Sequence, residues 1–195
     1  LFLSHCILNE NARYLGGAFC QGIHPCVLKE LSLSDAGVVQ MPCPEQGIWG
    51  GVMKTLVWMP FGTKGRFVFH IWRLAFPIFV LYTYLYYWLL ASRIVSAVLD
   101  YTRSGFKVVG IVGIDGSPSC GLRSHLDLKK SFHLNAALSI DNLERERFNT
   151  DMFGACVRPG SGIFFKLLQG KLRGKKLEIP LSALDAAEEM KGKEV

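Results

Sequence analysis

The sequence is poor in charge and lacks the short motifs that mark several common cofactor sites. Only 19% of its 195 residues are charged and 50% are hydrophobic, which argues against an intrinsically disordered chain. No Gly-x-Gly-x-x-Gly or Walker-type loop is present, so dinucleotide and ATP chemistry are not predicted. No Cys-x-x-Cys pair occurs, which argues against a closed structural zinc site. Without an internal repeat or a low-complexity tract, residues 1–195 are expected to form a single domain.

The chain also has no basic leader followed by an apolar stretch, and we predict no cleavable signal peptide. Its first residue is Leu and not Met, so we expect it to be a piece of a longer protein. Without an export signal, the six cysteines are expected to stay reduced in a cytoplasmic setting, where clustered cysteines more often bind metal. The net charge of +6 arises largely near the C-terminus; we interpret it as a solvated face and expect no nucleic-acid partner.

Three short apolar runs predict buried strands, and helical segments separate them. The strands are expected within residues 1–6, 37–42 and 107–114. Helices are expected at about Pro25–Leu33 and over Phe67–Arg103. Strands that alternate with helices predict a parallel sheet with right-handed crossovers. The predicted fold class is therefore α/β: a Rossmann-like parallel sheet with flanking helices and a long hydrophobic, aromatic helical segment.

Other parts of the chain give weaker patterns. Residues 9–17 are expected to form a polar loop between the first strand and the first helix. A helix is predicted within residues 154–170, around the run GIFFKLL. Residues 176–180 favour an edge strand stopped by its proline, and residues 181–191 favour a short amphipathic helix.

Residues 74–92 form an uncharged stretch bounded by Arg73 and Arg93. At about 1.5 Å per residue, a helix of this length could cross a hydrocarbon layer. The stretch contains four tyrosines and a tryptophan, however, and these residues normally collect at the membrane surface. Peripheral membrane contact or a homodimer face is favoured over a true span, and a buried core helix is a further alternative. The expected localisation is cytoplasmic, with membrane association left open.

Three cysteines follow the three predicted strands. Cys6 ends the first apolar run, Cys43 directly follows the second, and Cys120 follows the third after a short turn. Because the carboxyl ends of parallel strands share one edge of a sheet, we expect these thiols to converge there. Soft sulfur ligands suit zinc or an iron–sulfur cluster. Burial of the three cysteines as small hydrophobic side chains is the simpler alternative.

The residues around these cysteines form recognisable motifs. They are Cys6-Ile7-Leu8, Arg13-Tyr14-Leu15-Gly16-Gly17, Pro42-Cys43-Pro44-Glu45, Gly50-Gly51 and Ser117-Pro118-Ser119-Cys120-Gly121. The prolines fix the backbone beside a thiolate, and Gly121 is expected to allow an unusual backbone angle. With these motifs the first 122 residues resemble the thiouracil desulfidase family, of which the chain looks like a divergent member. The Gly-Gly pair is followed by Val52-Met53-Lys54 instead of the family's leucine and proline–arginine ending.

The resemblance implies a [4Fe–4S] cluster on Cys6, Cys43 and Cys120 and non-redox removal of sulfur from a thiocarbonyl. In the resulting hypothesis, an open iron binds the sulfur and a carboxylate deprotonates the attacking water. Glu45 is the predicted base because it lies two residues from Cys43. Ser117 or Ser119 is predicted to donate a hydrogen bond to the substrate or to relay its proton.

Several residues keep alternative interpretations. Asp115 and Glu10 are reserve candidates for the base, and His5 is either a partner of Cys6 or a core histidine. The other cysteines, Cys20, Cys26 and Cys156, are expected to be structural or surface thiols. The predicted function is thus a hydrolase: a [4Fe–4S]-dependent desulfidase acting on a small thio-substrate. The alternative is a non-catalytic iron–sulfur or sulfur-carrier protein associated with a membrane.

Overall fold

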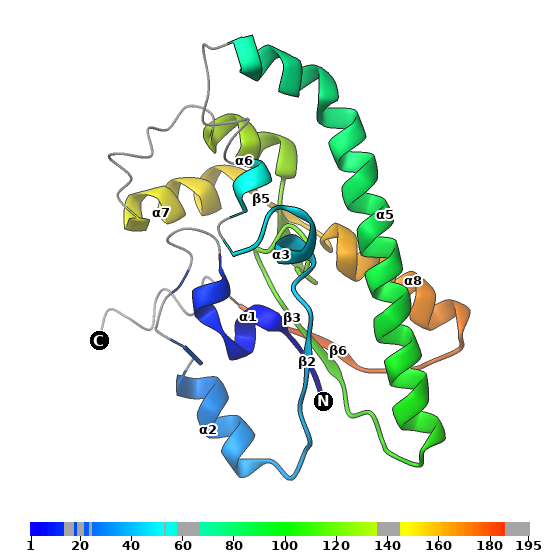
Figure 1. Cartoon of the computed structure of the whole chain (residues 1–195). Helices are drawn as coiled ribbons and strands as arrows, with labels where there is room; N and C mark the ends of the chain where they lie inside the picture. Colours follow the sequence, from blue (N-terminus) through cyan, green and yellow to red (C-terminus); the bar gives the residue numbers. More distant parts are fainter. Residues whose placement is uncertain are drawn as a thin grey trace.

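The computed structural model describes residues 1–13, 18, 22–23, 25–52, 54–57, 67–135 and 145–185. Its centre is a four-stranded sheet in the order β2-β1-β3-β6, and each neighbouring pair is parallel (Figure 1). The strands are β1 (Phe2–Ser4), β2 (Val39–Met41), β3 (Ile111–Ile114) and β6 (Leu181–Leu184). The predicted α/β fold with a Rossmann-like parallel sheet is confirmed, and three of the four strands lie within the predicted apolar runs.

The central strand explains why those runs carry so little polarity. All three residues of β1 are buried, and Phe2 lies in register with Val39 on one side and Ile111 on the other. A strand with neighbours on both edges and both faces buried has no side exposed to water, so it reads as continuously apolar. Phe2 N–H also donates to the Gly110 carbonyl at 2.9 Å, which fixes the start of the sheet.

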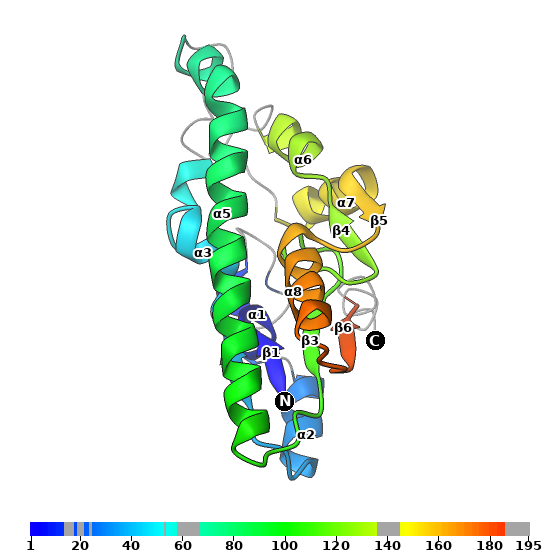
Figure 2. The same ribbon diagram turned by 90° about the vertical axis from the view of Figure 1, so that its right-hand side faces the viewer.

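Helices surround the sheet. In both views α5 and α8 lie side by side, while α2, none of whose residues is buried, lies apart from them near the N-terminus (Figure 1 and Figure 2). A two-stranded antiparallel ribbon, β4 (Ser124–Leu126) with β5 (Val157–Pro159), carries the chain towards α6 and α7. The helices are α1 (His5–Leu8), the 3-10 turn η1 (Glu10–Ala12), α2 (Pro25–Leu33), α3 (Pro44–Ile48), α5 (Phe67–Arg103), α6 (Leu128–Asn135), α7 (Arg145–Cys156) and α8 (Ile163–Gly174).

The core lies between α5, α8 and the sheet. Tyr87 of α5 packs edge-to-face on Phe164 of α8, with ring centroids 6.1 Å apart. Trp49, just after α3, donates its indole N–H to Thr83 of α5 at 3.2 Å. Because burial of one such side chain contributes about 1.5–3 kcal/mol, this contact region holds the inner face of α5 firmly on the protein.

Two C-terminal predictions are wrong. Residues 176–180 are not an edge strand: the strand begins after the proline, as β6, and the Pro180 carbonyl accepts a hydrogen bond from Ile111 N–H at 2.9 Å. Leu181–Leu184 is therefore strand and not the first turn of a helix, while residues 186–191 lie outside the described part. The helix expected within 154–170 begins later, at Ile163. The polar loop at 9–17 contains the turn η1, and 14–17 are not described.

The long helix is present over its full predicted range, Phe67–Arg103. By length and composition its Arg73–Arg103 part could cross a membrane, and it is the one such helix in the described ranges. Core helices of soluble proteins pass the same test but are mostly buried, whereas only 22% of the apolar window of α5 is buried. Figure 2 shows α5 beside α8.

Candidate functional site

A pocket opens at the carboxyl ends of the parallel strands, and the three predicted cysteines line it. Cys6, Cys43 and Cys120 reach it from three segments that are far apart in sequence. All three are free thiols; Cys120 is buried, and Cys6 and Cys43 are partly exposed. The empty space of the pocket, open solvent at its mouth included, is about 780 Å³. The expected convergence of the cysteines at one edge is therefore present.

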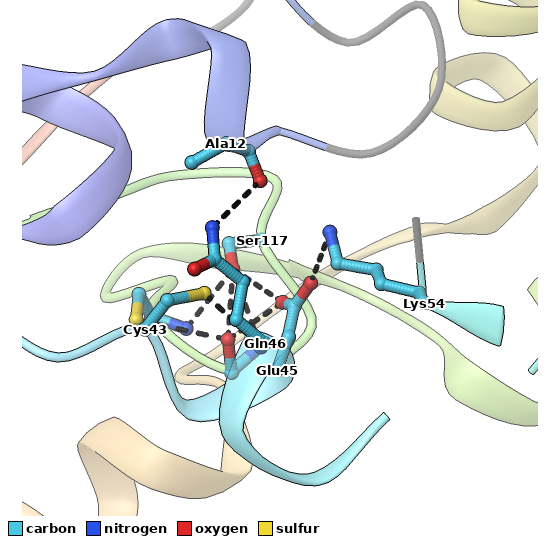
Figure 3. Close-up of polar contacts among 8 residues, drawn as sticks. Ala12, Cys43, Glu45, Gln46, Lys54 and Ser117 are labelled. Carbon is cyan, nitrogen blue, oxygen red and sulfur yellow. Dashed lines mark hydrogen bonds and ion pairs between the residues drawn. The ribbon is translucent and has the colours of Figure 1, made fainter. Parts of the chain in front are cut away.

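Each thiol is positioned by a different local structure. Cys6 does not end its strand, because β1 stops at Ser4 and Cys6 lies in the first turn of α1. Cys43 is the N-cap of α3, and its Sγ accepts a hydrogen bond from Gln46 N–H at 3.5 Å (Figure 3). Cys120 lies in a tight turn after β3, where its N–H donates to Ser117 Oγ at 3.0 Å.

The electrostatics of the thiols show that they share one environment. Burial is the main cause that raises the pKa of all three, to about 12 for Cys43. Charge on Cys6 or Cys43 would raise the pKa of Cys120 further. Without a bound cation these thiols are therefore protonated at neutral pH. In the described ranges, no group of three His, Cys, Asp or Glu side chains is arranged to hold a single metal ion.

Glu45 is the centre of the polar network beside the cysteines. It is only 7% exposed, and its Oε1 accepts hydrogen bonds from Ser119 Oγ at 2.7 Å and from Ser117 Oγ at 3.3 Å. The two serine hydroxyls are 3.2 Å apart, so a proton can pass between them. The three residues that sequence reasoning chose as base and donors are thus in direct contact, on α3 and on the turn after β3.

Lys54 completes this network, and sequence reasoning missed its role. Its Nζ lies 2.9 Å from Glu45 Oε2, and the residue is 3% exposed (Figure 3). Burial alone would lower the pKa of Lys54, but the Glu45 carboxylate raises it on balance. Gly50 and Gly51, both at positive φ, turn the chain back after α3 so that Lys54 can reach the pocket. One sequence feature could have indicated Lys54. After the Gly-Gly pair the sequence departs from the family's ending and places a single lysine in an otherwise apolar run.

Lys54 itself has a φ of 49°, in the left-handed region. Such a backbone conformation costs a residue with a Cβ roughly 1–2 kcal/mol. Strain of this kind persists where the surrounding contacts hold it, and it collects at functional sites. Here the ion pair with Glu45 is the contact that holds it.

Tyr87 is a second residue that sequence reasoning missed. Its side chain is fully buried, and its pKa is raised well above the ordinary value by burial and then by Glu45 and Cys120. Ser119 lies close enough to the phenol to act on its pKa in the opposite direction, but the Ser119 hydroxyl donates to Glu45 and leaves Tyr87 Oη without a partner of good geometry. α5 thus delivers one unpaired buried hydroxyl to the region of the cysteines. Its place in a uniformly aromatic helix hid it from any sequence pattern.

Glycines hold the turn that carries Cys120. A Cβ on Gly113 would lie 2.3 Å from the Cys120 carbonyl oxygen, and one on Gly162 would lie 2.6 Å from that of Ser119. Gly121 is needed for space and not for the unusual backbone angle that we expected: its φ is not positive, and its Cβ would lie 2.0 Å from the Ser124 carbonyl oxygen. Backbone approaches backbone closely at each point, which fixes the position of the thiol.

The reserve candidates for the base, Asp115 and Glu10, interact with other groups. Asp115 lines the pocket but accepts three backbone N–H bonds, from residues 122 to 124, and pairs with Arg123. Glu10 is buried against Arg13, with 3.4 Å between Oε1 and Nη2. His5 and Arg13 line the pocket, and burial lowers the pKa of His5. Cys156 is buried outside the pocket and Cys26 is exposed, whereas Cys20 lies outside the described residues.

No family model matches this chain, and no curated protein or solved structure does so either. The chemistry of the pocket is therefore the ground on which a function rests.

Proposed function

We propose that this protein is a [4Fe–4S]-dependent desulfidase that removes sulfur from a small thiocarbonyl compound by non-redox hydrolysis. The observation that carries the proposal is one pocket lined by Cys6, Cys43 and Cys120 together with the buried carboxylate of Glu45. The motif resemblance to the thiouracil desulfidase family points to the same chemistry. The substrate class is a thiocarbonyl; thiouracil itself is one member to be tested.

The donor set fits an iron–sulfur cluster. Three free thiols surround the pocket, and thiolates are the ligands by which proteins hold such clusters. Each cysteine binds a different iron of a cluster, so the sulfurs need not meet at one point as the ligands of a single ion must. When bound by three cysteines, the cluster supplies an iron that can act as a Lewis acid towards the substrate sulfur.

The protein's own groups supply the proton chemistry. Glu45 Oε1 faces two serine hydroxyls and is suited to take a proton from the water that attacks the thiocarbonyl carbon. The new C–O bond replaces the C–S bond, whose electron pair leaves with the sulfur as sulfide, so the carbon is neither oxidised nor reduced. Lys54 compensates the charge of the buried carboxylate from its other oxygen.

The remaining walls restrict what can enter. Ile114, Leu126, Met152 and Phe153 line the pocket, the last two from α7. Phe153 also packs directly on Gly116, where an added Cβ would lie 2.4 Å from its ring. An apolar wall of this kind suits the uncharged ring or alkyl part of a small thio-compound and keeps bulk water away from the carboxylate.

Iron analysis of anaerobically purified protein tests the cofactor. Wild-type protein is expected to hold about four irons and four sulfides per chain with a brown visible spectrum. Cys6→Ser, Cys43→Ser and Cys120→Ser are each expected to lose most of the iron. Cys156→Ser is the matched control, because Cys156 is also a buried free cysteine but lies outside the pocket, and it should keep the cluster. A colourless wild-type protein that contains zinc would contradict the cofactor.

Sulfide release tests the activity. Cluster-loaded wild-type protein is expected to release sulfide from small thiocarbonyls, thiouracil among them, with the carbonyl compound as the second product. The Cys120→Ser protein should release none. A protein that holds the cluster but releases no sulfide from any compound of this class would instead be the non-catalytic iron–sulfur or sulfur-carrier protein.

A further inference from the structure

The long helix α5 has two faces of different character. One face packs on the protein core through residues that include Thr83, Tyr87, Leu90 and Ile94. The other face carries large apolar side chains that are largely exposed; at its C-terminal end the Lys171 ammonium of α8 lies over the Trp88 ring, 3.6 Å from the ring centroid. Seven of them, which we name the outer stripe, are between 46% and 82% exposed: Phe67, Ile71, Leu74, Ile78, Leu81, Leu85 and Trp88.

The spacing of the outer stripe follows a heptad repeat. Successive members are alternately four and three residues apart from Phe67 to Trp88, which is the 3.5-residue period of a coiled-coil seam. In heptad terms Ile71, Ile78 and Leu85 occupy position a, and Phe67, Leu74, Leu81 and Trp88 occupy position d. Two of the three a residues are isoleucine and two of the four d residues are leucine, and isoleucine at a with leucine at d favours parallel two-stranded coiled coils.

The exposed area is large enough for a stable interface. Tyr82, Tyr84 and Leu89 flank the outer stripe and are 45–58% exposed. With them, ten large apolar side chains at roughly 100 Å² each expose on the order of 1,000 Å². The largest apolar patch of an ordinary monomer is about 300–600 Å², and each partner of a standard interface contributes about 800 Å². The patch therefore exceeds what a monomer exposes and matches what a dimer buries.

A second copy of the chain explains this surface better than a membrane does. A span would place the inner face of α5 in lipid, but that face is bound to Trp49 and to α8. A helix lying on a membrane surface carries lysines and arginines along its polar face. Here residues 74–92 have no charge, and the face opposite the outer stripe is the protein core. Two outer stripes, by contrast, can cover each other about a two-fold axis, with the Lys171 ammonium that lies over Trp88 at the C-terminal end of each stripe.

We infer that this protein is a homodimer in which the outer stripes of two α5 helices pack against each other. The upper end of α5 projects past the other helices in Figure 2, and Phe67, Ile71 and Leu74 at this end are at least half exposed. The inference is independent of the chemistry of the pocket, because the outer stripe is on the face of α5 opposite the core face.

Sedimentation velocity in detergent-free buffer tests the inference. Wild-type protein is expected to be a dimer, and Leu74→Glu/Leu81→Glu to raise the dissociation constant at least roughly 30-fold, since two d positions are lost. Ser96→Glu is the matched control, because Ser96 is an exposed residue of the same helix outside the outer stripe, and it should leave the dimer intact. Circular dichroism and thermal melting of each variant show that it is folded.

Two results would overturn the inference. One is a dimer that persists unchanged in folded Leu74→Glu/Leu81→Glu protein, because the interface would then lie elsewhere. The other is wild-type protein that is monomeric in buffer but floats with vesicles of phosphatidylcholine and phosphatidylglycerol, which would assign the outer stripe to a membrane.

Discussion

The buried carboxylate of Glu45 has two oxygens with different partners. Oε1 accepts from Ser117 and Ser119, and Oε2 pairs with Lys54. This division leaves Oε1 on the side of the serines as the atom that can exchange a proton with substrate water, while Oε2 holds the side chain in place. Replacement by an amide keeps the shape of the side chain but removes its basicity.

Glu45→Gln is therefore expected to lower kcat by about 10²–10⁴-fold, the usual contribution of a positioned base. Its iron and sulfide content should equal that of the wild type, because Glu45 is not among the proposed ligands. Steady-state sulfide release, measured beside the iron content of the same preparation, checks both points. Turnover at the wild-type rate would remove Glu45 from the proposed reaction.

The buried hydroxyl of Tyr87 is expected to lower the stability of the protein, which suggests that it has a role in activity. A buried hydroxyl without a hydrogen bond destabilises a protein by about 1–3 kcal/mol. Tyr87→Phe removes that group and keeps the ring that packs on Phe164, so the free energy of unfolding is expected to stay equal or to rise. Tyr87 does not itself line the pocket, so it can act on a bound substrate only through Ser119 beside it; in that case kcat/KM falls about tenfold in the same variant.

Urea unfolding and sulfide release measure the two effects on Tyr87→Phe separately. Tyr86→Phe is the control: it removes a hydroxyl from the neighbouring residue, which packs on Gly47 and not in the pocket, and it should leave kcat/KM unchanged. A Tyr87→Phe protein with unchanged kcat/KM would show that the phenol has no part in binding the substrate.

At the scale of elements, the turn between β3 and β4 is the most highly constrained part of the site. Asp115 Oδ1 accepts backbone N–H bonds from Leu122 at 3.0 Å and Arg123 at 2.8 Å, and so closes the turn that presents Cys120. Burial would raise the pKa of Asp115, but these N–H donors and the Arg123 guanidinium lower it on balance. The ionised carboxylate of Asp115 is thus more stable, relative to its protonated form, in the folded protein than in the unfolded chain.

This direction fixes the sign of the pH dependence. A carboxyl group with a lowered folded-state pKa contributes stability that is present above its ordinary pKa of 3.8 and is lost as the pH falls through the lower folded value. Asp115→Asn is expected to lower the free energy of unfolding by about 1.5–3 kcal/mol at pH 6, the contribution of hydrogen bonds to a charged group. Urea unfolding measures the free energy of unfolding at pH 6 and at pH 3. Its decrease from pH 6 to pH 3 should be smaller for Asp115→Asn than for the wild type. An equal decrease in both proteins would contradict the role of this turn.

Sequence patterns predicted the elements that are long or strongly periodic and failed on the short ones. The bounds of α2 and α5 follow from runs that end at recognisable residues, whereas β6 is a four-residue strand whose pattern LSAL fits a helix equally well. The cysteines, Glu45 and the two serines were predictable because motifs mark them. Lys54 and Tyr87 were not, because each joins the site through partners more than eight residues away that only the folded chain brings near.

At the scale of the whole molecule, the pocket joins parts of the chain that the sheet alone connects weakly. Cys6 lies on the segment after β1, Cys43 at the start of α3 and Cys120 beyond β3, and the strands between them are three or four residues long. A group bound to all three thiols adds cross-links between these segments. It binds the folded state and not the unfolded chain, so its binding free energy adds to the free energy of unfolding.

Loading the cluster is therefore expected to raise the melting temperature of the protein. A ligand at 100 times its dissociation constant adds about 2.7 kcal/mol, which corresponds to roughly 5–11 °C for a chain of this size. Calorimetry of reconstituted protein before and after anaerobic removal of iron measures the shift. Cys26→Ser, which changes an exposed cysteine outside the pocket, should show the full shift, and Cys120→Ser should show none. Equal melting temperatures for loaded and stripped wild-type protein would mean that the three segments are not joined through bound iron, and the pocket would then need a different occupant.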